Sequence, residues 1–257
     1  MIDLSSYDLV VFDGFGTLYD KDLLPLPGAL ELLEDMSCVS ILFSNVGSIT
    51  GDQLRIRLTN QFDNLPSTIV TSMDLLIRYL NDLDVKSIYH FGGRTADLEL
   101  EKQGITLASL RDQPEIIVFT SLPGDDWIQL SQSVLRMINS QNLQKLILAN
   151  PDRLLPGEHV GINVGMVFDM LVESWPKSKY DLPIVEIGKP NLNRCQLNIE
   201  DHKNVLVLGD NLITDGGLAS RLDADFVLIS CSEIDADFNG KDFKVYRSLE
   251  ELLIHGK

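Results

Sequence analysis

Short apolar runs alternate with longer amphipathic segments along this chain. The apolar runs have the length and the β-branched content of buried strands, and the amphipathic segments repeat apolar residues with the period of a helix. The predicted strands are 9–12, 39–43, 68–70, 87–91, 115–119, 145–149, 205–208 and 226–229. The predicted helices are 27–36, 72–83, 127–138 and 248–254, and the second begins at a cap near Thr71 or Ser72. Strands that alternate with helices predict an α/β fold with a doubly wound parallel sheet.

The middle of the chain is predicted to form an inserted unit. From about residue 85 the sequence begins a new set of strands, and the helix 127–138 lies between two of them. This set is sufficient for a small α/β domain of its own. We therefore predict a core domain from residues 1–83 and 183–257, and an inserted domain over 84–182. The segment 173–183 is the expected linker out of the insert.

Composition and charge restrict the classes of function. The chain has 257 residues, 44% of them hydrophobic, and a formal net charge of −17. Such a charge argues against nucleic acid as a partner, because no basic stripe is available to contact phosphates. No apolar stretch reaches the roughly 20 residues of a membrane span, so no membrane partner is expected. The start lacks a secretory signal, and Cys38, Cys195 and Cys231 are widely spaced, which predicts reduced, buried thiols and a cytoplasmic location.

Carboxylates follow two of the predicted strands. Asp13 comes directly after the run 9–12, and Asp210 follows 205–208 with Asp215 a little further along. The carboxyl ends of parallel strands form the ligand-binding edge of an open sheet. An ionised carboxylate there serves as a nucleophile or binds a hard divalent ion. Each aspartate alone is also compatible with a helix cap or a turn, which is the favoured interpretation for an isolated Asp13, but together they favour a metal site.

A hydroxyl, an amide and an ammonium occur at comparable places. Ser44 and Asn45 follow the strand 39–43, and Lys189 lies between a glycine and a proline. Thr17 adds a hydroxyl four residues after Asp13. Hydroxyls next to backbone N–H groups bind phosphate oxygens, and a fixed ammonium neutralises a phosphate and an anionic nucleophile. Read singly, Ser44 is an ordinary helix cap and Lys189 a surface turn; combined, they predict an anion pocket.

The segments that carry these polar residues resemble, in their order along the chain, the four motifs of the haloacid dehalogenase (HAD) superfamily. The motifs are Asp13-Gly14-Phe15-Gly16-Thr17, Ser44-Asn45, Lys189, and Gly209-Asp210 with Asp215. The runs 149–152 (ANPD), 188–190 (GKP) and 209–215 (GDNLITD) make the chain similar to subclass IIA, which contains nitrophenyl phosphatase-like, nucleotide, sugar and pyridoxal phosphate phosphatases. The resemblance implies a Rossmann-like core with a large α/β cap between the second and third motifs, where 84–182 falls.

The resemblance also implies roles for these residues. Asp13 would be the nucleophile that forms an aspartyl-phosphate. Asp13, the backbone carbonyl of Phe15 and Asp210 would hold Mg²⁺, and Asp215 would support the ion without binding it directly. The residues that would bind the phosphate are Thr17, Ser44, Asn45 and Lys189. Lys189 would have a catalytic role as well, and Asn45 would also help to shape its loop. The implied substrate is a small phosphorylated metabolite. Caps of this branch often mediate dimers, so a homodimer through the cap is expected, and the loops 151–153 and 156–166 are candidates for reading the leaving group.

Phe15 departs from the pattern of the phosphatases. They carry a second aspartate there, which protonates the leaving oxygen and then activates water, a contribution worth ~10²–10⁴-fold in rate. Phenylalanine supplies no proton, so one alternative is a phosphate-ligand binding protein without turnover. Dehalogenase members carry an aromatic residue at this position, so a second alternative is a haloacid dehalogenase-like hydrolase. Because Lys189, Asp210 and Asp215 are all present, we expect a slow, Mg²⁺-dependent phosphatase.

Overall fold

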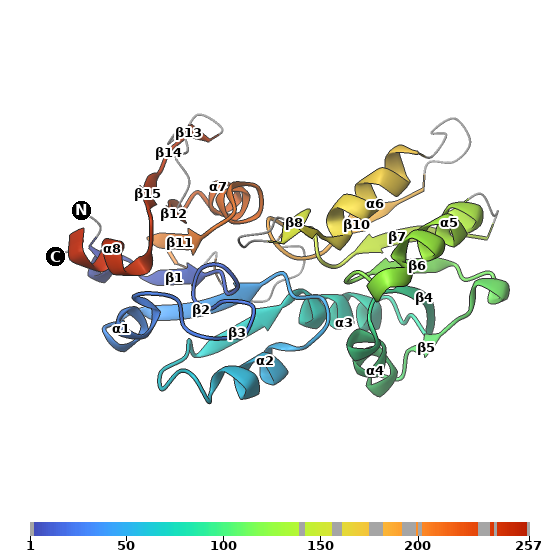
Figure 1. Cartoon of the computed structure of the whole chain (residues 1–257), viewed down its shortest axis with the longest axis horizontal. Coiled ribbons are helices and arrows are strands. Elements are labelled where there is room, and N and C mark those ends of the chain that lie inside the picture. Colours follow the sequence, from blue (N-terminus) through green and yellow to red (C-terminus); the bar gives the residue numbers. More distant parts are fainter. Residues whose placement is uncertain are drawn as a thin grey trace. The chain divides into compact units, whose positions relative to one another are not determined.

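The chain folds into two compact units. The computed structural model describes residues 3–138, 142–155, 161–174, 182–191, 199, 202–230, 237–238 and 241–255. The first unit comprises Met1–Ser44, Gly51–Val70 and Lys189–Lys257, and the second comprises Asn45–Thr50 and Thr71–Gly188 (Figure 1). Each unit contains a sheet with parallel strand pairs, which confirms the predicted α/β class.

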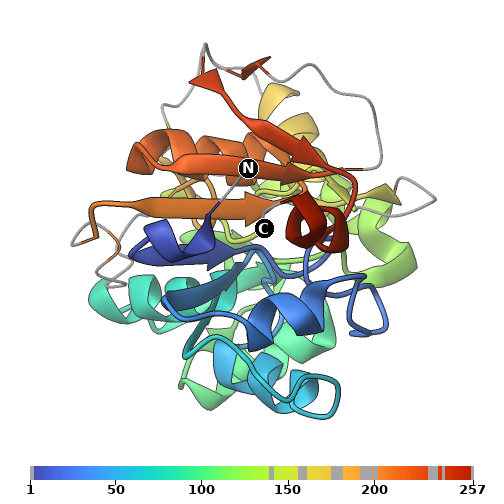
Figure 2. The same ribbon diagram turned by 90° about the vertical axis from the view of Figure 1, so that its left-hand side faces the viewer.

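A six-stranded sheet forms the centre of the first unit. Its order is β15-β12-β11-β1-β2-β3, and Figure 2 shows the red and orange strands running beside the blue ones. The strands are β1 (Leu9–Phe12), β2 (Val39–Ser44), β3 (Thr68–Thr71), β11 (Val205–Gly209), β12 (Asp225–Ile229) and β15 (Lys244–Tyr246). β1 pairs in parallel with β2 on one side and with β11 on the other. The chain therefore changes direction across the sheet at β1, and ligands bind at the carboxyl edge of such a switch point.

Helices and turns complete the first unit. The helices are α1 (Ala29–Glu34), α2 (Gly51–Leu58), α7 (Gly217–Leu222) and α8 (Leu249–His255), with a 3₁₀ turn at Leu4–Ser6, a π-helical turn at Leu212–Gly216 and the hairpin β13 (Asp237–Phe238) and β14 (Lys241–Asp242). The predicted helix 27–36 is confirmed but begins later, at Ala29, because Gly28 adopts φ +85. A Cβ on Gly28 would lie under 3.0 Å from the backbone of Glu250 in α8, so glycine permits this close approach.

A five-stranded sheet with the order β10-β7-β6-β4-β5 forms the second unit. Its strands are β4 (Ser87–Phe91), β5 (Thr106–Leu107), β6 (Ile116–Phe119), β7 (Lys145–Leu148) and β10 (Ile184–Glu186), all in parallel pairs. The other elements are α3 (Ser72–Asp82), α4 (Arg94–Lys102), α5 (Trp127–Ile138), α6 (Val164–Glu173), the hairpin β8 (Leu154–Leu155) and β9 (Gly161–Ile162), and 3₁₀ turns at Leu110–Asp112 and Gly124–Asp126. Phe91, Phe119 and Phe168 pack in the core with ring centroids 5.0 and 5.1 Å apart. Burial of each such ring stabilises the unit by about 1.5–3 kcal/mol.

The start of α3 follows the predicted chemistry. Thr71 caps the helix, since its hydroxyl accepts from the Asp74 N–H at 3.3 Å and the Asp74 carboxylate accepts from the Thr71 N–H at 2.8 Å. α3 belongs to the second unit, whereas the sequence predicted a domain boundary after residue 83. The predicted boundaries stay a prediction.

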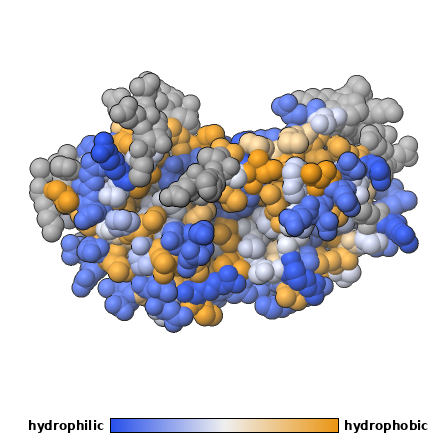
Figure 3. Space-filling view, viewed as in Figure 1, coloured by the Kyte–Doolittle hydropathy of each residue, from blue (hydrophilic) through white to orange (hydrophobic). Residues whose placement is uncertain are grey.

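Several predictions concern residues outside the described part of the chain. They are Cys195, Cys231, most of the linker 173–183, and residues 156–160 of the candidate cap loops. The third cysteine, Cys38, is a free thiol but only half-buried, so the prediction of a buried thiol is wrong there. On the face in Figure 3, hydrophilic and hydrophobic residues are interspersed over the first unit, as on most globular proteins. None of the described helices combines the length and the apolar character that crossing a bilayer requires.

Candidate active site

The ends of two adjacent strands bring the first carboxylates together. Asp13 directly follows β1, and its N–H donates to the Leu208 carbonyl at 2.8 Å, which extends the β1–β11 ladder by one residue. Asp210 directly follows β11, and Asp215 lies in the π-helical turn that comes next. Asn211 fixes this turn, because its side-chain oxygen accepts from the N–H groups of Ile213 and Thr214 at 2.9 and 3.3 Å.

The three carboxylates form one cluster in the first unit. One oxygen from each of Asp13, Asp210 and Asp215 lies within 4.8 Å of the others; Asp13 and Asp215 are buried and Asp210 is half-buried. Mg²⁺ prefers oxygen ligands at about 2.0–2.1 Å, so its ligand atoms stand roughly 3–4 Å apart. The donor type and the spacing therefore fit a hard divalent ion.

Two glycines make room for these carboxylates. A Cβ on Gly16, which adopts φ +90, would lie under 3.0 Å from the Asp210 carboxylate. A Cβ on Gly209 would lie equally close to the carboxylate of Asp215. Both glycines flank the cluster in sequence, so the local chain is built to let the aspartates approach its backbone.

Lys189 is buried among the same acids. Its side chain is 2% exposed, and Nζ donates to Oδ1 of Asp13 and, at 2.7 Å, to Oδ1 of Asp215. The second oxygen of Asp215 accepts from the Asn211 N–H at 3.1 Å. Both carboxylate oxygens of Asp215 thus accept hydrogen bonds from groups of the protein. Charges buried to this extent are tolerated only when they are paired, and Lys189 supplies the pairing.

The polar side chains of the second motif fall into different surroundings. Ser44, the last residue of β2, is buried in the first unit, whereas Asn45 belongs to the second. The Asn45 amide donates to Asp152 at 3.0 Å, and its oxygen accepts from the Ser72 hydroxyl at 3.3 Å. Asn45 is therefore a residue that fixes its own loop. In the first unit, the Thr17 hydroxyl donates to Oδ2 of Asp13 at 3.4 Å.

Sequence reasoning missed Tyr19, which is buried in the first unit with 2% of its surface exposed. A Cβ on Gly14 would lie under 3.0 Å from the phenol ring, so glycine at position 14 makes room for it. Burial raises the pKa of the Tyr19 phenol, and the Asp13 carboxylate raises it further. Ser44 and Lys189 lower this pKa, but by less. The group is a protonated hydrogen-bond donor at neutral pH. Gly14 was the only sequence signal for this arrangement.

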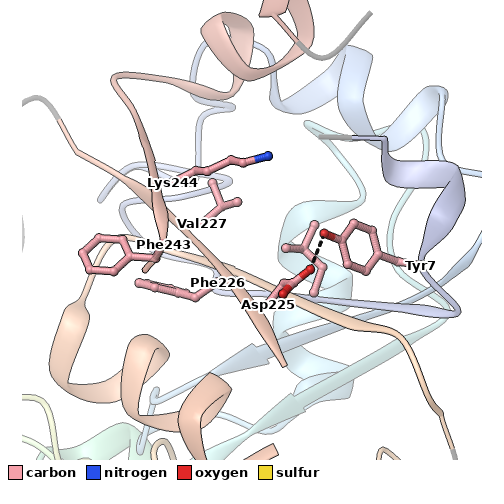
Figure 4. Close-up of a pocket in the computed structure, with 7 residues that line it drawn as sticks. Tyr7, Asp225, Phe226, Val227, Phe243 and Lys244 are labelled. Carbon is pink, nitrogen blue, oxygen red and sulfur yellow. Dashed lines mark hydrogen bonds between the residues drawn. The ribbon is translucent and has the colours of Figure 1, made fainter. Parts of the chain in front are cut away.

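A separate pocket of about 190 Å³ lies at the other edge of the same sheet. Its lining includes Leu206 and Asp225, which stand at the starts of β11 and β12, whereas Asp210 follows the end of β11. The Tyr7 hydroxyl points to the Asp225 carboxylate and donates to it at 2.7 Å (Figure 4). None of the residues predicted for the site lines this pocket.

The fold is shared with several solved structures. A 4-nitrophenylphosphatase from Thermotoga maritima is 20% identical with a TM-score of 0.75, and 99% of each chain is covered. A glycerol phosphate phosphatase from Mycobacterium tuberculosis, solved with magnesium, is 19% identical with a TM-score of 0.73 over 97% of this chain and 78% of that chain. A haloacid dehalogenase-like hydrolase from Brucella suis 1330 is 19% identical with a TM-score of 0.73 over 88% and 86%.

Comparisons of sequence alone find less. No protein-family model matches the chain, and no curated protein matches it. The three-dimensional likeness covers 88–99% of this chain and shows a shared fold. The chain has the fold of the HAD-superfamily phosphatases, as its motifs predicted.

Proposed function

We propose that this protein is a Mg²⁺-dependent phosphatase that hydrolyses a small phosphorylated metabolite through an aspartyl-phosphate on Asp13. The observation that carries the proposal is the cluster of Asp13, Asp210 and Asp215 around the buried Lys189. The names of the neighbouring structures support the class of reaction, and one of them was solved with magnesium and also with calcium.

The proposed chemistry has two steps at Asp13. A carboxylate oxygen attacks the phosphorus in line, the bond from phosphorus to the leaving oxygen breaks, and the leaving group takes a proton from water. Water then attacks the phosphorus of the aspartyl-phosphate, which releases inorganic phosphate and restores the carboxylate. Lys189 orients Asp13 and offsets the repulsion between nucleophile and phosphate, while the hydroxyls of Thr17 and Ser44 donate to the phosphate oxygens. When bound by Asp13, Asp210 and the Phe15 carbonyl, Mg²⁺ supplies further positive charge for the phosphate.

Phe15 makes the proposed turnover slow. Its side chain is half-buried in the loop after Asp13 and carries no group that exchanges protons. The same residue favours the second candidate, a protein that binds a phosphorylated ligand without hydrolysing it. Saturable binding of a phosphomonoester with no release of phosphate would identify that second function.

The second unit, which contains most of the predicted cap, is proposed to select the leaving group. Arg153 lies in one of the candidate loops, and its guanidinium is held by Asp169 with contacts of 2.6 and 3.4 Å. This pairing fixes the direction of a cation that a polar or anionic substrate group can approach. The proposed homodimer through the cap is tested separately by light scattering on the purified chain.

Release of phosphate from a panel of phosphomonoesters, with Mg²⁺ present, tests the proposal. Asp13→Asn keeps the size of the side chain and removes the nucleophile, so activity should fall to background. Asp52→Asn, at an exposed position in the first turn of α2, is the matched control and should keep full activity. If wild type and Asp13→Asn release phosphate equally slowly from every substrate, the enzyme proposal is wrong.

A further inference from the structure

The hydroxyl of Tyr19 is an unusual group in the first unit. Among the described residues, it is the buried side-chain polar atom for which no hydrogen-bond partner is found. Buried hydroxyls nearly always have a partner, because leaving one without a partner costs free energy. An unpaired donor in a native protein therefore calls for an explanation, and a ligand absent from the free chain is one.

The position of this hydroxyl points to the anion pocket. It lies against Gly14, the residue after Asp13, at a place that a Cβ on Gly14 would occupy. Asp13 and Lys189 act on the phenol through their charges, and the Ser44 side chain lies within hydrogen-bonding reach of it. Ser44 makes no hydrogen bond of ordinary geometry with it. The three residues around the Tyr19 hydroxyl are thus the nucleophile and two of the proposed phosphate-binding groups.

Gly14 gives independent support for a role beyond packing. Its φ does not fall in the left-handed region, so backbone conformation alone does not require glycine. Any larger residue would meet the end of the Tyr19 side chain. The chain has a small residue beside the nucleophile, and the space is filled by a side chain that ends in a donor. A phenylalanine would fill that space equally well without leaving a hydroxyl unpaired.

We propose that the Tyr19 hydroxyl donates a hydrogen bond to an oxygen of the phosphoryl group bound at Asp13, alongside Ser44. This inference rests on the proposed function only in that a phosphate occupies the pocket. It holds equally for a phosphatase and for a phosphate-ligand binding protein. Tyr19 would then contribute to affinity for the phosphoryl group rather than to the recognition of the leaving group.

Tyr19→Phe tests the inference, because it removes one oxygen and keeps the ring against Gly14. Tyr89→Phe is the matched control, since Tyr89 is also buried but lies in the second unit. The full-length chain with Mg²⁺ is titrated with inorganic phosphate and with orthovanadate by calorimetry. A hydrogen bond to a charged group predicts a loss of affinity of about 10- to 100-fold for Tyr19→Phe. The control should stay within twofold of wild type.

Stability measured without phosphate separates binding from a purely structural role. If the hydroxyl serves to bind phosphate, Tyr19→Phe should melt at the same temperature as the wild type or at a higher one, and it should bind phosphate more weakly. Wild-type phosphate affinity in Tyr19→Phe, or a lower melting temperature together with unchanged affinity, would overturn the inference and leave the proposed function standing. If the wild type neither binds nor releases phosphate, the proposed function fails and the inference fails with it.

Discussion

Replacement of Lys189 by methionine is the most direct test of the charge arrangement in the first unit. Methionine has a similar length but no charge, so the variant leaves Asp13 and Asp215 as buried carboxylates without their ammonium. Asp13 is 7% exposed and Asp215 is 1% exposed, so water cannot compensate for the loss. Removal of one partner of a buried ion pair costs about 3–5 kcal/mol. Because Lys189 contacts two carboxylates, we expect the upper end of that range.

The expected loss is large enough for calorimetry. At about 2–4 °C per kcal/mol for a chain of this size, the melting temperature should fall by about 10–20 °C. The measurement is made at pH 7 with EDTA, and Mg²⁺ should then restore part of the loss, since a divalent ion neutralises the same carboxylates. Lys145→Met is the control. It removes a lysine charge in the same way, but the Lys145 ammonium contacts the Tyr79 hydroxyl at 3.2 Å in the second unit, so the carboxylates of the first unit keep their ammonium. A Lys189→Met protein that melts within about 2 °C of wild type in EDTA would refute the reasoning.

Three further outcomes are expected. Phe15→Asp should raise kcat by about 10²–10⁴-fold in the phosphomonoester assay, and an unchanged kcat would show that turnover is limited elsewhere. Gly28→Ala should lower the free energy of unfolding in urea by clearly more than Gly104→Ala, because both glycines have positive φ but only Gly28 faces backbone within 3.0 Å. Burial raises the pKa of Tyr19, so the folded phenol stays protonated after the unfolded one ionises near 10.0. Wild-type stability should therefore decline above pH 10 by up to about 1.4 kcal/mol per pH unit more than that of Tyr19→Phe; parallel declines would argue against a buried phenol.

The strands that carry the site were predictable because they are buried on both faces. The runs 9–12 and 205–208 are nearly unbroken apolar sequences, and each ends at an aspartate. The geometry of parallel sheets then places both aspartates at one edge. The structure brings these acids together, with Asp215 and Lys189, in one cluster.

Other elements gave no readable pattern. The buried stripe of α4 includes the charged Glu99, and α6 has apolar residues outside its buried stripe as well, so the contrast between the two faces is weak in both sequences. β10 has three residues and pairs with β7 of the second sheet, which no local pattern predicts. Lys189 follows that strand in a turn and belongs to the first unit, so the lysine lies where the chain passes between the two units. Tyr19 was missed because its role depends on a contact with Gly14 that hydrophobic spacing does not encode.

The charge of the cluster leads to a last prediction about the metal. Three ionised carboxylates and one ammonium leave two net negative charges in a small, largely buried volume. A phosphate dianion entering this volume would be repelled strongly, because charges interact far more in such surroundings than in water. A divalent cation brings the sum to zero, so the ion should be required for phosphate to bind and not only for its transfer. We therefore expect EDTA to abolish calorimetric binding of inorganic phosphate as well as turnover, and Mg²⁺ to restore both. Phosphate that bound equally well in EDTA would contradict the arrangement of charges around Asp13, since the cluster would then bind a dianion while it carries a net negative charge itself.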